Sequence, residues 1–143
     1  MQNIISIIPV AFALVYIIFY MLSGRNSNPT TFRYNELFKN NTLKKHLLIA
    51  ICFSILGIFR FNVIPLNVMP LEAYYFTPLL FILTIKILNY PFSAFYNRNI
   101  IIALRGDRPP KGKNGIKILD RVLGCVIVVI SITAPSIITL LLK

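Results

Sequence analysis

The sequence is poor in the residues that enzymes use for chemistry. Its 143 residues include one histidine, four acidic residues and no tryptophan. The acids Glu36, Glu72, Asp107 and Asp120 do not stand at a spacing that builds a metal site, or an acid–base pair with His46. We therefore expect a protein that is not an enzyme and that has no metal ion or other cofactor.

Neither the cysteines nor the histidine points to redox or metal chemistry. Cys52 and Cys125 each lie inside an apolar run, with no CxxC pair and no neighbouring histidine. Both are expected to be small packing residues. His46 follows two lysines where a helix is predicted to begin, and we expect it to be exposed at the membrane interface.

Apolar side chains are in large excess. Hydrophobic residues make up 57% of the chain and charged residues 13%, with a mean hydropathy of +0.74. Soluble domains have about 45–50% apolar and about 25% charged residues. Long uncharged runs alternate with basic ones, as expected when some segments lie in lipid and others in water. The sequence therefore predicts an all-α integral membrane protein with a single membrane domain over residues 1–143.

Four apolar runs are each about long enough to cross a hydrocarbon core of roughly 30 Å at 1.5 Å per residue. They predict transmembrane helices in a compact bundle, over residues 4–22, 47–64, 71–90 and 122–142. The third helix is expected to stop near Pro91. Residues 92–104 are predicted to form a short helix in the interface, or to bend the third helix out along the membrane surface. Small residues at helical spacing predict close helix packing: Ala50, Ser54 and Gly57 in the second run, and Gly124, Ser131, Pro135 and Thr139 in the fourth.

Basic residues are unevenly divided between the predicted loops. Residues 23–46 hold five Lys or Arg and residues 91–121 hold seven, whereas the short loop 65–70 holds none. The positive-inside rule places both basic loops in the cytoplasm, the short loop outside, and both termini on the outer face. Contacts with anionic lipid headgroups are predicted for the basic residues of the second long loop: Arg98, Arg105, Arg108, Lys111, Lys113, Lys117 and Arg121.

The net charge of +11 also bears on partners. The basic residues flank membrane segments and leave no soluble domain that could dock on a nucleic acid, so membrane lipids are the expected partner of this charge. The abundance of Ile, Asn, Lys and Phe, together with the short loops, favours a bacterial inner membrane.

Three ionisable residues in or near the predicted spans are candidates for function. Lys86 lies inside the third span, where an ionisable group often marks a transport pathway. It also stands about one turn from the predicted cytoplasmic end, within reach of the headgroups by snorkelling. Arg60 and Glu72 lie near the outer ends of the second and third spans. We expect their side chains to meet, either as a clasp of the helical hairpin or as a binding determinant that faces outward.

Three classes of function fit these features. The favoured one is a non-enzymatic binding or accessory protein that contacts another membrane protein, or a second copy of itself, through helix faces. In outline the chain is similar to immunity proteins against pore-forming bacteriocins, which are small and basic with three or four spans; the likeness is one of architecture and involves no motif. A small homo-oligomeric transporter or channel is the alternative, although the first span lacks the glutamate that small multidrug exporters carry there. A membrane enzyme is the third class.

Overall fold

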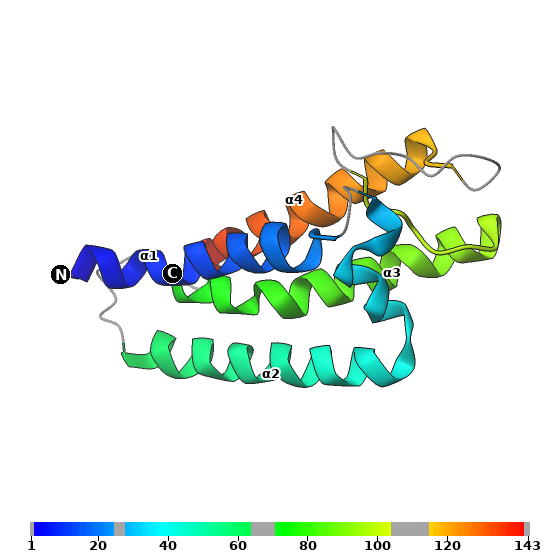
Figure 1. Cartoon of the computed structure of the whole chain (residues 1–143). Helices are drawn as coiled ribbons and strands as arrows, with labels where there is room; N and C mark the ends of the chain where they lie inside the picture. The colour runs from blue at the N-terminus through cyan, green and yellow to red at the C-terminus, as the bar shows by residue number, and fades with distance from the viewer. Residues whose placement is uncertain (1, 25–27, 64–70, 104–114, 142–143) are drawn as a thin grey trace.

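Four helices run side by side with alternating direction and form the body of the protein (Figure 1). The computed structural model describes residues 2–24, 28–63, 71–103 and 115–141, and no strand occurs among them. The helices are α1 (Gln2–Leu14), α2 (Asn40–Val63), α3 (Thr77–Tyr96) and α4 (Ile118–Leu141). A π-helix, η1 (Val15–Met21), continues α1, and a 3-10 helix, η5 (Leu71–Phe76), leads directly into α3. The start of α1 and the end of α4 lie toward the same end of the bundle (Figure 1).

Three of the described helices are long and apolar enough to cross a membrane. They cover Asn40–Arg60, Leu71–Tyr96 and Ile118–Leu141, with lengths of 21, 26 and 24 residues. The predicted all-α membrane protein is supported to this extent. The first predicted span, over residues 4–22, corresponds to α1 and η1, in which the described apolar stretch Ile7–Met21 is shorter than the other three.

The first basic loop is more ordered than predicted. Two 3-10 helices, η3 (Pro29–Thr31) and η4 (Arg33–Phe38), occupy part of it, and α2 begins at Asn40 rather than near residue 47. Thr42 helps to set this start, because its hydroxyl donates to the backbone carbonyls of Glu36 and Lys39. The helix extends before the predicted span because lysines are good helix formers when their ammonium groups reach water.

The third helix also differs from the prediction. It runs through Pro91 and ends after Tyr96, where Asn97 adopts the left-handed conformation with φ of 51°. Asparagine tolerates this conformation and commonly ends helices in this way. Residues 97–103 are not helical, and Ile100–Ala103 are buried. Of the two alternatives predicted for residues 92–104, a separate interfacial helix is absent from the described part, residues 92–103, whereas α3 does continue past Pro91, as far as Tyr96.

The small-residue stripes pack as predicted. Ala50, Ser54 and Gly57 are buried on one face of α2, where a Cβ at Gly57 would lie 3.0 Å from the Cβ of Tyr75 in η5. The buried stripe of α4 consists of Asp120, Gly124, Ile127, Ser131, Pro135 and Thr139. The cysteines were expected to pack as well, but both Cys52 and Cys125 are exposed on the apolar outer surface. Several small residues at helical spacing predict which face of a helix packs inward, whereas a single cysteine does not show on which face it lies.

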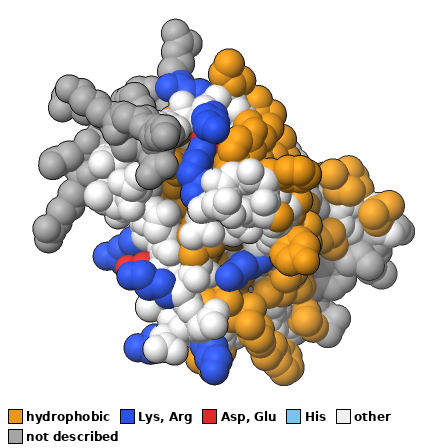
Figure 2. Space-filling view, turned by 90° about the vertical axis from the view of Figure 1, so that its right-hand side faces the viewer, with side chains coloured by type: hydrophobic (Ala, Val, Ile, Leu, Met, Phe, Trp, Pro, Cys, Tyr) orange, Lys and Arg blue, Asp and Glu red, His pale blue; other side chains and the backbone are white. Residues whose placement is uncertain are grey.

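The interior between the helices is filled by large apolar side chains. The fully buried ones include Ile17 and Met21 from η1, Phe81, Ile82 and Ile85 from α3, and Ile127 from α4. α2 packs against η5, which also contacts α1 and α4. Seen end-on, the end of the bundle that carries the described basic segments shows Lys and Arg side chains scattered over its face, with hydrophobic side chains gathered mainly on one side (Figure 2). The described parts of the two basic loops, which include η4 and residues 97–103, lie at this end of the bundle.

Candidate functional site

Arg60 and Glu72 meet at the end of the bundle that lies away from the basic segments. Arg60 donates from Nε to Oε2 of Glu72 at 3.1 Å, and from Nη2 to Oε1 at 3.2 Å. The Glu72 side chain is 2% exposed and that of Arg60 is 40% exposed. The expected contact is confirmed, and its bidentate form gives it a defined geometry. It joins the end of α2 to η5, as a clasp would.

Arg98 and Asp120 form a second ion pair, at the basic end. Arg98 Nη2 lies 2.6 Å from Asp120 Oδ2, and Nη1 lies 3.1 Å from Oδ1. Asp120 is fully buried and the Arg98 side chain is 17% exposed. Arg98 was predicted to contact lipid headgroups, but its guanidinium binds the buried Asp120 carboxylate within the protein and compensates its charge.

Three consecutive backbone amides are held by side chains from three different elements. Ile100 N donates to Oδ1 of Asn89 in α3 at 2.8 Å, and Ile101 N donates to Oδ1 of Asp120 in α4 at 3.1 Å. Ile102 N donates to the hydroxyl of Tyr34 in η4 at 2.9 Å. These bonds satisfy the buried backbone of residues 100–102, which has no helix or strand to do so. The segment is a structural plug at the basic end.

Lys86 lies at the level of the basic end of α2. Its Nζ is 6.0 Å from the centre of the Phe38 ring, and Phe38 stands just before α2 begins. The residue is half-buried. α3 continues ten residues beyond it to Tyr96, about 15 Å at 1.5 Å per residue, so Lys86 is not within one turn of the helix end as predicted.

The other residues predicted to contact headgroups divide into two sets. Lys117 and Arg121 are exposed at the start of α4, and the Lys117 ammonium lies 4.4 Å from the centre of the Tyr96 ring. The remaining four lie outside the described residues: Arg105, Arg108, Lys111 and Lys113.

His46 does not lie exposed at the interface as expected. It is 7% exposed, and its Nε2 lies 3.3 Å from Oε2 of Glu36. Their separation of ten positions suggested no pairing in the sequence. η4 folds back against α2 and brings them together. No group of three or more His, Cys, Asp or Glu that could hold a metal ion occurs within the described residues.

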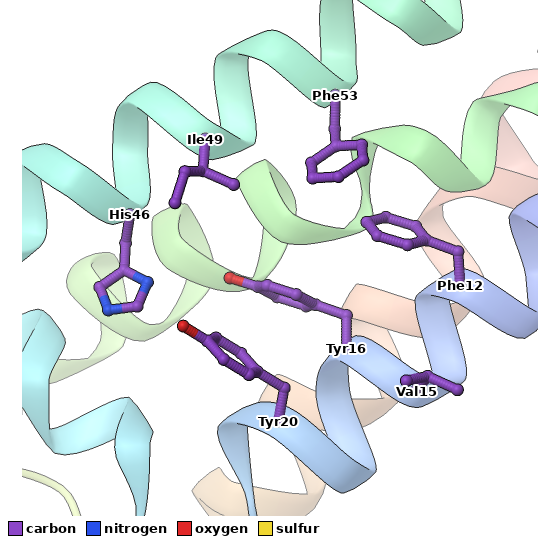
Figure 3. A pocket seen from close by; sticks show the side chains of 7 residues that line it. All are labelled: Phe12, Val15, Tyr16, Tyr20, His46, Ile49 and Phe53. Atoms are coloured by element: carbon purple, nitrogen blue, oxygen red, sulfur yellow. The ribbon is translucent and has the colours of Figure 1, made fainter.

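An apolar groove lies between the first helix and α2 (Figure 3). Its volume is about 260 Å³, and its lining side chains are Phe12, Val15, Tyr16 and Tyr20 on one side and His46, Ile49 and Phe53 on the other. Figure 3 shows the hydroxyls of Tyr16 and Tyr20 pointing along the groove toward the His46 side. The centres of the Tyr20 and His46 rings are 6.1 Å apart. The Arg33 guanidinium lies over the Tyr20 ring, 4.7 Å from its centre. One end of the groove is therefore polar and the rest apolar.

The sequence analysis missed this groove, although a signal for it exists. Phe12, Tyr16 and Tyr20 recur every four residues, and the wall from α2 has positions three and four apart, so each set shares a helix face. What could not be read from the sequence is that these two faces oppose each other.

Comparison of the chain with protein-family models, curated proteins and solved structures finds no match. Any function must therefore be argued from the geometry itself.

Proposed function

We propose that this protein is a small, non-enzymatic, multi-pass membrane protein that acts by binding a partner protein within the membrane. The observation that carries this proposal is the closed interior of the bundle. Large apolar side chains fill the space between the described helices. The buried carboxylates of Glu72 and Asp120 are each bonded to an arginine. A chain that offers neither a polar path nor a reactive cluster in its described part is left with its outer surfaces for function.

The surface best suited to a partner is the outer face of α2. Only 22% of its span is buried, compared with 44% for Leu71–Tyr96. It packs inward through the stripe of Ala50, Ser54 and Gly57, and its opposite face carries Leu48, Ile55 and Phe59, which are all exposed. These three positions form one continuous apolar ridge along the helix.

The placement of Lys86 favours a binding protein over a transporter. Its ammonium lies 6.0 Å from the centre of the Phe38 ring, just before the start of α2. At that level the long aliphatic stem can lie in the hydrocarbon while the charge reaches the headgroups. In this proposal Lys86 snorkels toward the basic end of α2 and does not line a transport path.

In the proposed topology, α1 with η1 makes a fourth crossing of a bacterial inner membrane. The basic end of the bundle then faces the cytoplasm and both termini face outward. Fusion of a reporter that is active only outside the cytoplasm after Lys143 tests this topology. Activity of the fusion is the expected result, and activity of a cytoplasmic reporter at that position would contradict it.

A specific form of this function is immunity, in which α2 binds the membrane segment of a pore-forming bacteriocin. The test is to produce the protein in a sensitive bacterium and to challenge it with a panel of such toxins. Protection against one toxin, lost when Leu48, Ile55 and Phe59 are changed to alanine, is the expected result. The matched control changes Val122, Val129 and Leu140, which form an equally exposed ridge on α4. Equal loss in both triple variants would argue against recognition by α2, and protection against no toxin would argue against immunity.

A further inference from the structure

The groove between the first helix and α2 contains a buried donor without an acceptor. Tyr16 is 8% exposed, and its hydroxyl has no hydrogen-bond partner among the described residues. Buried polar groups are nearly always paired, since an unpaired one loses its hydration without compensation. The hydroxyl points into the groove (Figure 3), so a molecule bound there would be in position to supply the acceptor.

The backbone departs from regular α-helix at this place. Tyr16 and Tyr20 both lie in the π-helix η1, where Leu22 N donates to the carbonyl of Ile17, five residues earlier, at 2.9 Å. Its wider turn stacks the two phenol rings, whose centres are 5.8 Å apart. Segments of π-helix are rare and frequently occur at functional sites. Here the segment aligns both hydroxyls in one direction.

The surroundings of the groove show where its occupant would come from. Val15 and Ile49 line it, one from each wall, and are 54% and 44% exposed. In a membrane this apolar surface faces hydrocarbon, so the groove opens toward lipid. At its polar end Arg33 lies over the Tyr20 ring, on the end of the bundle that carries the basic segments.

We infer that this groove is a binding site for one glycerophospholipid from the leaflet at the basic end. One acyl chain lies along Phe12, Val15, Ile49 and Phe53. An ester carbonyl oxygen accepts the hydrogen bond from the Tyr16 hydroxyl, and the phosphate lies near the Arg33 guanidinium. The order of these groups along the groove matches the order of chain, ester and phosphate in such a lipid. The volume of about 260 Å³ is slightly below the range of about 300–1,000 Å³ for small-molecule sites, so it holds the ester region and only the first part of one acyl chain, and the rest of the lipid lies in the bilayer.

The polar end of the groove holds the ionisable side chains of Arg33, Glu36 and His46. Glu36 and His46 engage each other there at 3.3 Å, which leaves the Arg33 guanidinium to meet a phosphate. Arg33 is exposed, so its contribution is expected to be modest and sensitive to salt. The Tyr16 hydroxyl is the specific element of the site. This inference rests on the membrane location of the protein and does not depend on a protein partner.

The test is a titration of the delipidated full-length protein, in mild detergent, with dioleoylphosphatidylglycerol, followed by native mass spectrometry. The wild-type chain is expected to saturate at one lipid. Tyr16→Phe keeps the ring and removes only the donor, and we expect it to weaken binding about fivefold, as for loss of one hydrogen bond. Tyr90→Phe is the matched control, because Tyr90 is 82% exposed on α3, and it is expected to bind as the wild type does.

A second variant tests the apolar part of the groove independently. Ile49→Trp places bulk where the acyl chain would lie, and we expect it to abolish saturable binding even with Tyr16 intact. Equal affinity of the wild type and Tyr16→Phe, or uptake of several lipids with no plateau at one, would overturn the inference. A quinone also carries carbonyl oxygens and dissolves in the membrane, so a parallel titration with a short-tailed ubiquinone tests it as an alternative occupant. Displacement of the phospholipid by the quinone would show that the groove is a quinone site instead.

Discussion

Tyr34 accepts a hydrogen bond from the backbone amide of Ile102, although the two residues are 68 positions apart in the chain. The N–O distance is 2.9 Å, and both residues are fully buried. This contact joins η4, from the first basic loop, to the segment that follows α3. The described parts of the two basic loops, η4 and residues 97–103, are thus joined by a buried hydrogen bond.

Removal of the Tyr34 hydroxyl is expected to destabilise the protein. Tyr34→Phe leaves the Ile102 amide buried without an acceptor, which costs about 1–3 kcal/mol. The measurement is the unfolding free energy in detergent, followed by circular dichroism during denaturant titration. Tyr90→Phe, at an exposed position, serves as the control and should change the free energy by less than about 0.5 kcal/mol. Equal stability of the two variants would mean that water or another group satisfies the Ile102 amide.

The Arg98–Asp120 pair should be more costly to break. Asp120→Asn keeps the shape of the side chain but leaves the Arg98 guanidinium uncompensated, and about 3 kcal/mol of stability should be lost. In a double-mutant cycle, Arg98→Leu and Asp120→Leu each leave the other charge unpaired, whereas the double variant leaves no unpaired charge. The double variant should therefore lose less stability than the sum of the losses in the two single variants. Additive losses in this double-mutant cycle would show that the two charges do not stabilise each other.

At the opposite end, Glu72→Gln should lower the thermal stability of the detergent-solubilised protein. The Glu72 carboxylate is buried and accepts two hydrogen bonds from Arg60, while the guanidinium is partly exposed and therefore partly screened. A loss of about 1–2 kcal/mol is expected. Glu36→Gln is the matched change at a carboxylate whose side chain is 48% exposed, and it should have the smaller effect. If Glu72→Gln leaves the thermal stability unchanged and abolishes protection against the toxin, the pair is a binding determinant and not a clasp.

Two glycines should differ in their tolerance of alanine. A Cβ at Gly57 would lie 3.0 Å from the Tyr75 Cβ and 3.2 Å from the Glu72 carbonyl oxygen, so α2 must move away from η5 to admit it. At Gly124 the nearest atoms, in Ile102, are 3.3 Å away. Gly57→Ala is expected to cost about 1–3 kcal/mol, and Gly124→Ala less. The same unfolding assay ranks them, and the reverse order would show that α2 adjusts more easily than the segment packed on α4.

Sequence reasoning predicted features that depend on one segment at a time. The small-residue stripes of α2 and α4 were found because periodicity within one helix defines its packing face. The contact between Arg60 and Glu72 was found because a short loop leaves the adjoining helix ends near each other. The burial of His46 against Glu36 and the pairing of Arg98 with Asp120 were missed. Each requires a segment outside the α-helices to fold back onto a helix, and the local sequence pattern does not show where such a segment goes.

Hydropathy and charge are sums over neighbouring residues, so the order of the chain by itself determined that lipid is the expected solvent and which end of the helices is basic. Only the tertiary structure decided which side chains from distant segments meet. The end of α3 at Asn97, the plug held by Asn89, Asp120 and Tyr34, and the groove with its unpaired Tyr16 hydroxyl all arise from such meetings. Burial and hydrogen-bond satisfaction are properties of the surroundings in space, and these surroundings exist only once the helices have packed.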